Sequence, residues 1–192
     1  MVALSLDPSK PQVAPRSDFD EFRKSAYPIH IGSSLTEIDA DKAQIAFRSA
    51  RRHDKVLFDI DSNGGQLKHT SRLLTVIYEL LDLGIDVRVL VGDKCFSVAM
   101  SVLMFFPAEA RYCRPNSSFM IHSIHFGDNE IEMSPQIQRF VKKKNKLFFL
   151  NLIPASTRIT KESLREVLDS REDVFITASE ALELGIVSAI ID

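Results

Sequence analysis

The chain has 192 residues, of which 45% are hydrophobic and 26% charged, and this balance is typical of a folded domain with a sizeable core. Its formal net charge of −2 gives no broad attraction to nucleic acid or to acidic lipid. No uninterrupted apolar run reaches the length of a membrane span, so we expect neither nucleic acid nor a membrane as a partner.

Residues 1–24 are predicted to form a flexible N-terminal arm, because prolines and scattered charges dominate its first part. The arm lacks the basic start and sustained apolar stretch of a signal peptide. Cys95 and Cys113 lie in apolar context without the spacing of a metal site, which favours buried reduced thiols. These features together predict a cytoplasmic protein whose single domain spans residues 25–192.

Short apolar strands and amphipathic helices then alternate along the chain. Strand–helix–strand order predicts an α/β fold with a mainly parallel sheet covered by helices. The first elements expected are strands at 27–32, 55–61 and 86–92, and helices at 37–52, 66–84 and from about Ser97.

The second half of the domain contains a fourth strand, at 117–126, and three helices with clear start signals. Ser134 and Pro135 form an N-cap and first-turn pair that opens a long helix, which Pro154 is expected to end. Thr160 should cap a shorter helix, and Thr177 with Glu180 forms a capping box. A last apolar strand is predicted at 186–192.

Unusual residues follow two of the predicted strands, where open parallel sheets gather their ligands. Gly64 and Gly65 follow one strand, and their backbone N–H groups could hold an oxyanion or a phosphate. The simpler reading is that this glycine pair only makes a tight turn.

Ser97 follows the next strand and begins a helix, so it is either a residue chosen for close packing or a nucleophile. A serine nucleophile needs a base to take its proton and an acid to orient that base. Asp173 is one of many candidate acids. The base would be one of five histidines: His30, His53, His69, His122 and His125. Because His122 and His125 point to opposite faces of one strand, at most one of them is expected to meet Ser97.

Four segments decide between these readings: "LFDIDSNGG", "VGDKCFSVAM", "RYCRPNSSFMIH" and "REDVFITASEALELGIVSAII". In order and spacing they resemble the Clp protease proteolytic subunit (ClpP) family, within the ClpP/crotonase superfamily. The resemblance runs from about Ile29 to the C-terminus. Cys95 and Phe96 stand where the family has small residues, and Asn63 replaces a proline, which indicates a divergent member.

The resemblance implies that Ser97 is the nucleophile, His122 the base and Asp173 the acid. It places the backbone N–H groups of Gly65 and Val98 in the oxyanion hole, and it implies neither a cofactor nor a metal. The implied fold is a ClpP/crotonase-like spiral of ββα units, with residues 127–163 as a protruding strand–helix handle.

The implied function is that of a serine endopeptidase that hydrolyses peptides or unfolded proteins inside an oligomeric chamber. By resemblance the partners are further copies of the chain, in a heptamer or a stacked double ring, and an AAA+ unfoldase. Two alternatives stay open: a catalytically inactive ClpP-like assembly subunit and a crotonase-like acyl-CoA enzyme.

An apolar stripe on the long helix is expected to pack against another subunit, and the alternative is that it folds back on its own domain. The stripe consists of Ile137, Phe140, Val141, Leu147 and Phe148.

Overall fold

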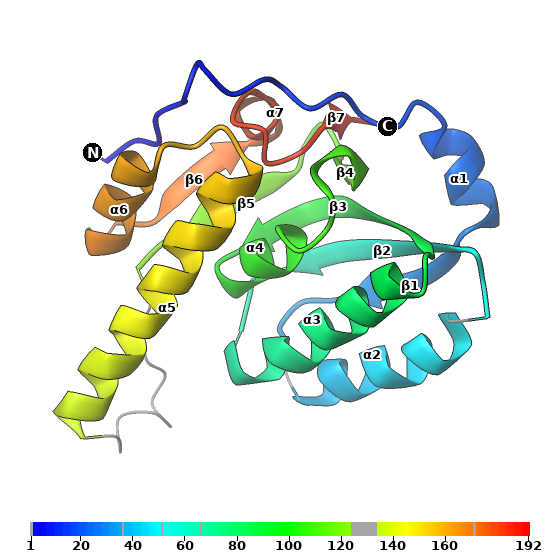
Figure 1. Cartoon of the computed structure of the whole chain (residues 1–192), viewed down its shortest axis with the longest axis horizontal. Coiled ribbons are helices and arrows are strands. Elements are labelled where there is room, and N and C mark those ends of the chain that lie inside the picture. The colour runs from blue at the N-terminus through cyan, green and yellow to red at the C-terminus, as the bar shows by residue number, and fades with distance from the viewer. Residues whose placement is uncertain (1, 36, 51, 66, 124–133, 171) are drawn as a thin grey trace.

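The computed structural model describes residues 2–35, 37–50, 52–65, 67–123, 134–170 and 172–192 (Figure 1). The described strands form one sheet with the order β1-β2-β3-β4-β7, in which β5 pairs with both β3 and β6. Every pairing is parallel except that between β5 and β6, so the prediction of an α/β fold with a mainly parallel sheet is confirmed. The strands are β1 (Tyr27–Ile31), β2 (Lys55–Ser62), β3 (Asp86–Phe96), β4 (Arg111–Cys113), β5 (Ser118–Ile121), β6 (Val174–Thr177) and β7 (Ala189–Ile190).

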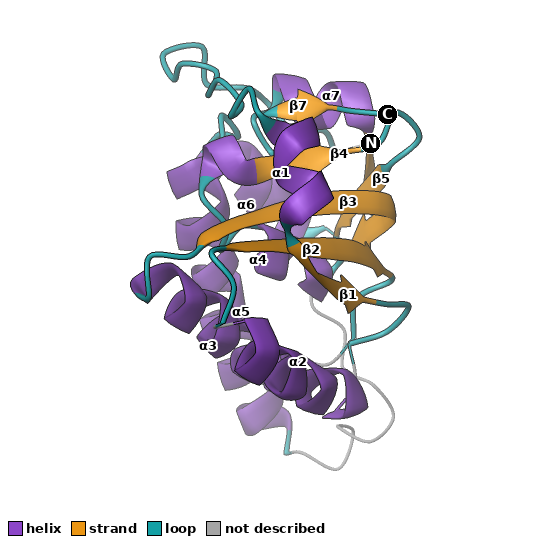
Figure 2. Cartoon of the chain, turned by 90° about the vertical axis from the view of Figure 1, so that its right-hand side faces the viewer, coloured by secondary structure: helices purple, strands orange, loops and turns teal. Residues whose placement is uncertain are grey.

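Helices cover both faces of the sheet because successive strand side chains point to opposite sides. In β2, Phe58 faces the main core, which is shared with the long helix α3, whereas Leu57 faces a smaller cluster with Phe19 and Phe22 of the first helix. Figure 2 shows α1 on its own face of the sheet and α2 and α3 together on the other. The helices are α1 (Phe19–Ser25), α2 (Glu37–Ala50), α3 (Leu67–Asp82), α4 (Val98–Leu103), α5 (Pro135–Ser156), α6 (Lys161–Asp169) and α7 (Ala178–Glu183).

The central strand β3 is longer than predicted, because it continues through residues 93–96, beyond its expected end at Gly92. The extension is stabilised by a change of partner. Residues 89–91 pair with β4, and residues 94–96 pair with β5 instead. The strand therefore carries the chain beyond the reach of β4 before it turns into α4.

The three predicted helix starts are confirmed by their cap hydrogen bonds. The Ser134 and Thr160 side chains each accept a hydrogen bond from a backbone N–H of the first turn, and Thr177 and Glu180 form both bonds of the capping box. The expected end of α5 at Pro154 is wrong, since the helix continues to Ser156. A proline so close to a helix end removes only one intrahelical hydrogen bond, and the last turn persists.

Helix α5 is divided between an exposed half and a buried half. Ile137 and Phe140 are 51% and 60% exposed near its start, whereas Phe149 and Ile153 are buried near its end. Phe148, expected in the outward stripe, stacks on Phe105 at a ring-centroid distance of 6.4 Å. The stripe therefore folds back on its own domain at one end and faces outward at the other. Residues 124–133, which include the first part of the expected handle, lie outside the described residues.

A buried arginine fixes the far end of α4. Arg111 is 1% exposed, and its guanidinium donates to the backbone oxygens of Phe106 at 2.7 and 2.9 Å and of Met104 at 3.0 Å. It also donates to Ser156 O, at the end of α5, at 3.2 Å. Burial lowers the pKa of Arg111 to about 10, so the side chain is still charged at neutral pH. The short helix is thereby tied to α5 at one end while its other end meets Ser97.

Candidate active site

Ser97 sits at the sharp turn between β3 and α4, with backbone angles φ 55° and ψ −119°. It is the single non-glycine residue with positive φ among those the structure describes. Such a conformation costs about 1–3 kcal/mol and persists only where the surrounding structure imposes it. Here Ser97 N–H donates to Met120 O of β5 at 2.8 Å, so sheet pairing continues into the turn. This geometry, seen at nucleophile elbows, places the hydroxyl outside the strand.

His122 follows β5 directly, and the same strand that holds the Ser97 backbone therefore supplies the facing imidazole. The distance from Ser97 Oγ to His122 Nε2 is 2.6 Å, within hydrogen-bonding range. The His122 side chain is 20% exposed. A hydroxyl and an imidazole at this distance can exchange a proton directly.

Asp173 reaches the other side of the imidazole from the neighbouring strand. Ile121 pairs with Val174 in the antiparallel β5–β6 ladder, so the residues just beyond this pair, His122 and Asp173, face each other. His122 Nδ1 and Asp173 Oδ1 are 3.3 Å apart, and the Asp173 side chain is 48% exposed. The three side chains thus form a continuous row, with the imidazole between the hydroxyl and the carboxylate.

The glycine pair packs against the serine turn. A Cβ on Gly64 would lie 2.7 Å from Phe96 O and 2.9 Å from the Ser97 Cβ, and a Cβ on Gly65 would lie 2.4 Å from Leu35 O. Neither position has room for a side chain. The Gly64 N–H donates to Ser62 Oγ at 3.2 Å, within the turn itself. The would-be Cβ of Gly64 is also 3.3 Å from Val98 N, so the two predicted oxyanion segments adjoin.

The nucleophiles nearest to Ser97 in sequence are both engaged in packing. Cys95 is fully buried, and burial raises the pKa of its thiol far above the ordinary value, which suppresses the reactive thiolate. The Ser101 hydroxyl is buried and donates to Val98 O at 2.6 Å, one turn back in α4. Burial also raises the pKa of the Cys113 thiol, to about 12.

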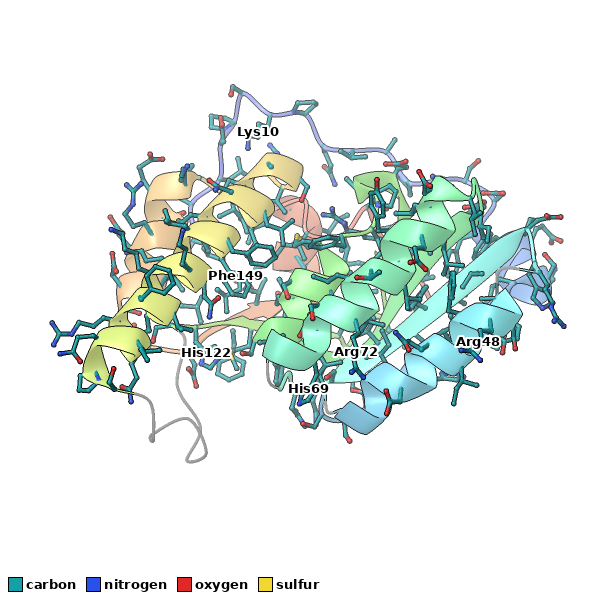
Figure 3. All side chains as sticks on the ribbon, turned by 60° about the horizontal axis from the view of Figure 1, so that its bottom comes forward. Lys10, Arg48, His69, Arg72, His122 and Phe149 are labelled. Atoms are coloured by element: carbon teal, nitrogen blue, oxygen red, sulfur yellow. The ribbon has the colours of Figure 1, made fainter. Side chains whose placement is uncertain are left out.

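The other described histidines lie away from this row. His30 is on β1, with its Nδ1 3.3 Å from Asp59 Oδ2, and its side chain is 73% exposed. His53 stacks on Tyr27 at 4.8 Å between ring centroids. His69 lies in the first turn of α3 (Figure 3). His125 lies outside the described residues.

Sequence reasoning missed two contacts at the site. The close packing of Gly64 on the serine turn is one, since the resemblance singled out only Gly65. The other is an edge-to-face contact between Phe96 and Phe175, with ring centroids 5.7 Å apart, beside the serine turn. The bulk of Phe96, noted at a position where small residues are usual, was the signal available in the sequence.

Neither a metal cluster nor a membrane-spanning helix occurs in the described part of the chain. Its His, Cys, Asp and Glu residues form no group of three or more that could hold a metal ion. Its helices include none with both the length and the apolar character needed to cross a bilayer.

The fold and the row of side chains define a class: α/β proteins in which a serine at a strand-to-helix turn contacts a histidine that in turn meets a carboxylate. Comparison with known proteins narrows this class. The sequence model of the Clp protease family matches residues 25–192, and the chain therefore belongs to that family.

One curated relative is the ATP-dependent Clp protease proteolytic subunit 3 of Arabidopsis thaliana, a chloroplastic protein. The two sequences are 30% identical over an alignment of 178 residues, and the match covers 85% of this chain and 52% of the relative. The chain thus spans about half the length of this relative.

Proposed function

We propose that this protein is a serine endopeptidase that hydrolyses peptide bonds with Ser97, His122 and Asp173. The observation that carries the proposal is the 2.6 Å contact between Ser97 Oγ and His122 Nε2 at a strained strand-to-helix turn. Membership of the Clp protease family supports the same reaction class. The Ser97–His122 contact favours the peptidase over the inactive subunit, and family membership favours it over the acyl-CoA enzyme.

In this mechanism His122 Nε2 accepts the hydroxyl proton while Ser97 Oγ attacks the scissile carbonyl. Asp173 holds the imidazole with its Nδ1 proton toward the carboxylate and stabilises the imidazolium that forms. The imidazolium then donates its proton to the leaving amine, which leaves an acyl-enzyme on Ser97. Water, deprotonated by His122, hydrolyses that ester and restores the serine.

The oxyanion of the tetrahedral intermediate is assigned to the backbone N–H groups of Gly65 and Val98. Two observations support this assignment. Gly64 N–H is already bonded to Ser62 Oγ, and the absence of side chains at both glycines lets the turn pack directly beside Val98 N. Preorganised backbone donors of this kind stabilise charge that develops in the transition state.

The test is covalent labelling by a fluorophosphonate probe, with the wild-type protein beside Ser97→Ala. We expect the wild type to be labelled and the variant not, with peptide hydrolysis reduced by several orders of magnitude, about 10⁴ or more. A Ser97→Ala protein that hydrolyses peptides as fast as wild type would refute the assignment.

We further propose that the protein self-associates in rings that enclose its active sites and that it works with an AAA+ unfoldase. The exposed Ile137 and Phe140 on the outer half of α5 support the first part, since apolar and aromatic side chains are typical of obligate interfaces. The name of the Arabidopsis relative, an ATP-dependent protease, supports the second. The buried thiols Cys95 and Cys113 fit a reducing compartment such as the cytoplasm.

Sedimentation of Phe140→Asp tests assembly, because a charge placed in the seam should break a double ring into smaller particles. Lys143→Asp, on the same half of α5 but at an exposed charged position, is the matched control and should leave the particle size unchanged. Phe148 is unsuitable for this test, since it packs inside its own subunit. A wild type that sediments as a monomer at micromolar concentration would refute the assembly proposal.

A further inference from the structure

The first residues of the chain do not hang free of the body but lie along it as an extended segment. Within residues 2–6 the side chains alternate: Val2, Leu4 and Leu6 are half-buried against the main core, whereas Ala3 and Ser5 are exposed. This period of two is that of a strand lying on an apolar surface. In Figure 1 this segment starts beside α6, and the chain after it continues across the top of the molecule to α1.

Backbone hydrogen bonds attach this segment to the loop that precedes α6. Leu6 forms an isolated antiparallel bridge with Ile159, and Thr160 N–H donates to Ser5 O at 2.9 Å. Asp7 N–H donates to Arg158 O at 2.6 Å. The segment is thus paired along part of its length like an added strand.

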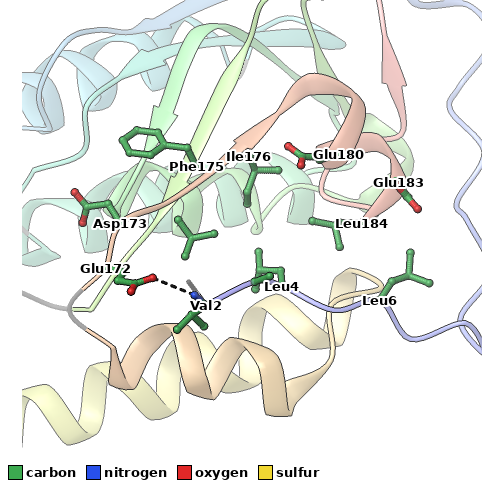
Figure 4. A pocket seen from close by; sticks show the side chains of 12 residues that line it. Val2, Leu4, Leu6, Glu172, Asp173, Phe175, Ile176, Glu180, Glu183 and Leu184 are labelled. Carbon is green, nitrogen blue, oxygen red and sulfur yellow. Dashed lines mark hydrogen bonds between the residues drawn. The ribbon is translucent and has the colours of Figure 1, made fainter.

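The tip of the segment reaches the residue that precedes Asp173. Val2 N–H donates to Glu172 Oε2 at 3.0 Å (Figure 4). Glu172 N–H in turn donates to Ser170 Oγ at 3.1 Å. A cleft of about 600 Å³ lies between the segment and β6, and Val2, Leu4 and Asp173 all line it. One wall of the cleft is therefore the arm, and the other carries the carboxylate that faces His122.

Asp173 has little other support from the sheet. It precedes the first residue of β6, and within the described residues β6 pairs with β5 alone, so the opposite edge of β6 has no strand partner. On the side of β6 that lines the cleft, the arm supplies the apolar side chains that face Val174 and Ile176. The arm therefore contributes support to Glu172 and Asp173 on the cleft side of β6.

We propose that residues 2–6 are a positioning element for Asp173: by binding the Glu172 side chain and packing along the cleft beside β6, they direct the Asp173 carboxylate toward His122. This proposal rests on the proposed peptidase function. Asp173 lines the cleft beside the arm whereas Ser97 and His122 do not, so the arm is expected to act through Asp173. Undocking the arm should therefore impair the orientation of the imidazole and leave the nucleophile turn intact.

The test compares Leu4→Ser with Val13→Ser in the full chain. Both changes remove an apolar side chain from the arm, but Leu4 lines the cleft whereas Val13 is 39% exposed and outside it. For Leu4→Ser we expect kcat for a peptide to fall about tenfold with KM within about twofold, since orientation of a catalytic group affects the chemical step. Hydrogen exchange at residues 172–174 should become faster. Val13→Ser should match wild type. Leu4→Ile, which keeps an apolar side chain at this position, should retain the wild-type kcat.

A second variant guards against general loss of folding. Val2→Pro removes the N–H that donates to Glu172 Oε2 and keeps an apolar side chain, so it should also lower kcat, by a smaller factor. In both arm variants the inflection of the rate–pH profile should move toward lower pH, because the imidazolium loses its carboxylate partner.

The outcomes separate the two proposals. A labelled, active wild type whose kcat and pH inflection are unchanged by Leu4→Ser and Val2→Pro overturns the role of the arm and leaves the peptidase proposal standing. A wild type that no fluorophosphonate labels and that cleaves no peptide overturns the peptidase proposal, and with it the role of the arm.

Discussion

The residues on the two sides of the His122 imidazole are held in place by different numbers of contacts. On the side of the proposed nucleophile (the nucleophile side), Ser97 Oγ lies 2.6 Å from His122 Nε2, and the Ser97 backbone is held by β5 and by close packing against Gly64. On the side of the proposed acid (the acid side), Asp173 Oδ1 lies 3.3 Å from His122 Nδ1, and Asp173 is 48% exposed and precedes a strand at the edge of the sheet.

This difference shows that residues of one site can be held in place in two ways, by a central strand or by an edge strand. A residue at the end of a central strand inherits its position from pairings on several sides, and displacing it requires the core to move. A residue at the start of an edge strand depends on fewer contacts and is screened by water. Changes on the nucleophile side should therefore cost more than equivalent changes on the acid side.

Among substitutions that keep Ser97, the largest effect is expected for Gly64→Ala, which disrupts the nucleophile side. The new methyl group would collide with Phe96 O and the Ser97 Cβ at a position with φ +92°, so the turn must move. Misplacement of a reacting group by about 1 Å costs about 10² in rate, and loss of an oxyanion donor costs 10²–10³, so we expect a loss on the order of 10³ in probe-labelling rate. Gly32→Ala is the matched control, because nothing lies within 4 Å of the position where its new Cβ would be. Labelling of Gly64→Ala within twofold of wild type would contradict this prediction.

A smaller loss is expected for Asp173→Asn, which breaks the acid side. The amide favours the wrong tautomer of His122, an effect that costs about 10⁴ where the triad acid is buried. Because Asp173 is half exposed, water can take over part of its role, and we expect kcat to fall about 10²-fold with folding retained. Circular dichroism and peptide turnover measure the two quantities. Full turnover by this variant would show that another acid orients the histidine, or that none is needed.

The smallest expected effect is a shift in the pH dependence of probe labelling when Asp173 is replaced, which measures the influence of the acid side on His122. His122 must be neutral to accept the hydroxyl proton, so labelling should slow as the pH falls through the range in which imidazoles titrate, about 6.5. A nearby carboxylate favours the imidazolium, so Asp173→Asn should move the inflection to lower pH, by about one unit or less for an exposed pair. Rates of probe labelling, measured by quenching the reaction at set times between about pH 5 and 8, check both the pH dependence and its shift. An inflection unmoved by the substitution would mean that the Asp173 carboxylate has no electrostatic influence on the base.

Much of the architecture follows from local patterns in the sequence. The 3.6-residue period of α3 and the caps at Ser134, Thr160 and Thr177 depend on neighbours within one or two turns, and each was predictable for that reason. Three short elements were not predicted: the α1 helix and the strands β4 and β6. Each has only three to seven residues, too few to show a period, and is stabilised by pairing or docking with distant segments.

The sequence by itself determined which residues are candidates: Ser97 after a central strand, His122 and Asp173 in segments that resemble one family, and a glycine pair where backbone donors are useful. The tertiary structure alone decided how they meet. The β3–β5 and β5–β6 registers bring Ser97, His122 and Asp173 into one row, although 25 residues separate the first two. Register, the strain at Ser97 and the docking of the arm beside Asp173 all depend on contacts between distant parts of the chain. Local patterns carry no information about such contacts, because their free energy appears only when the sheet has formed.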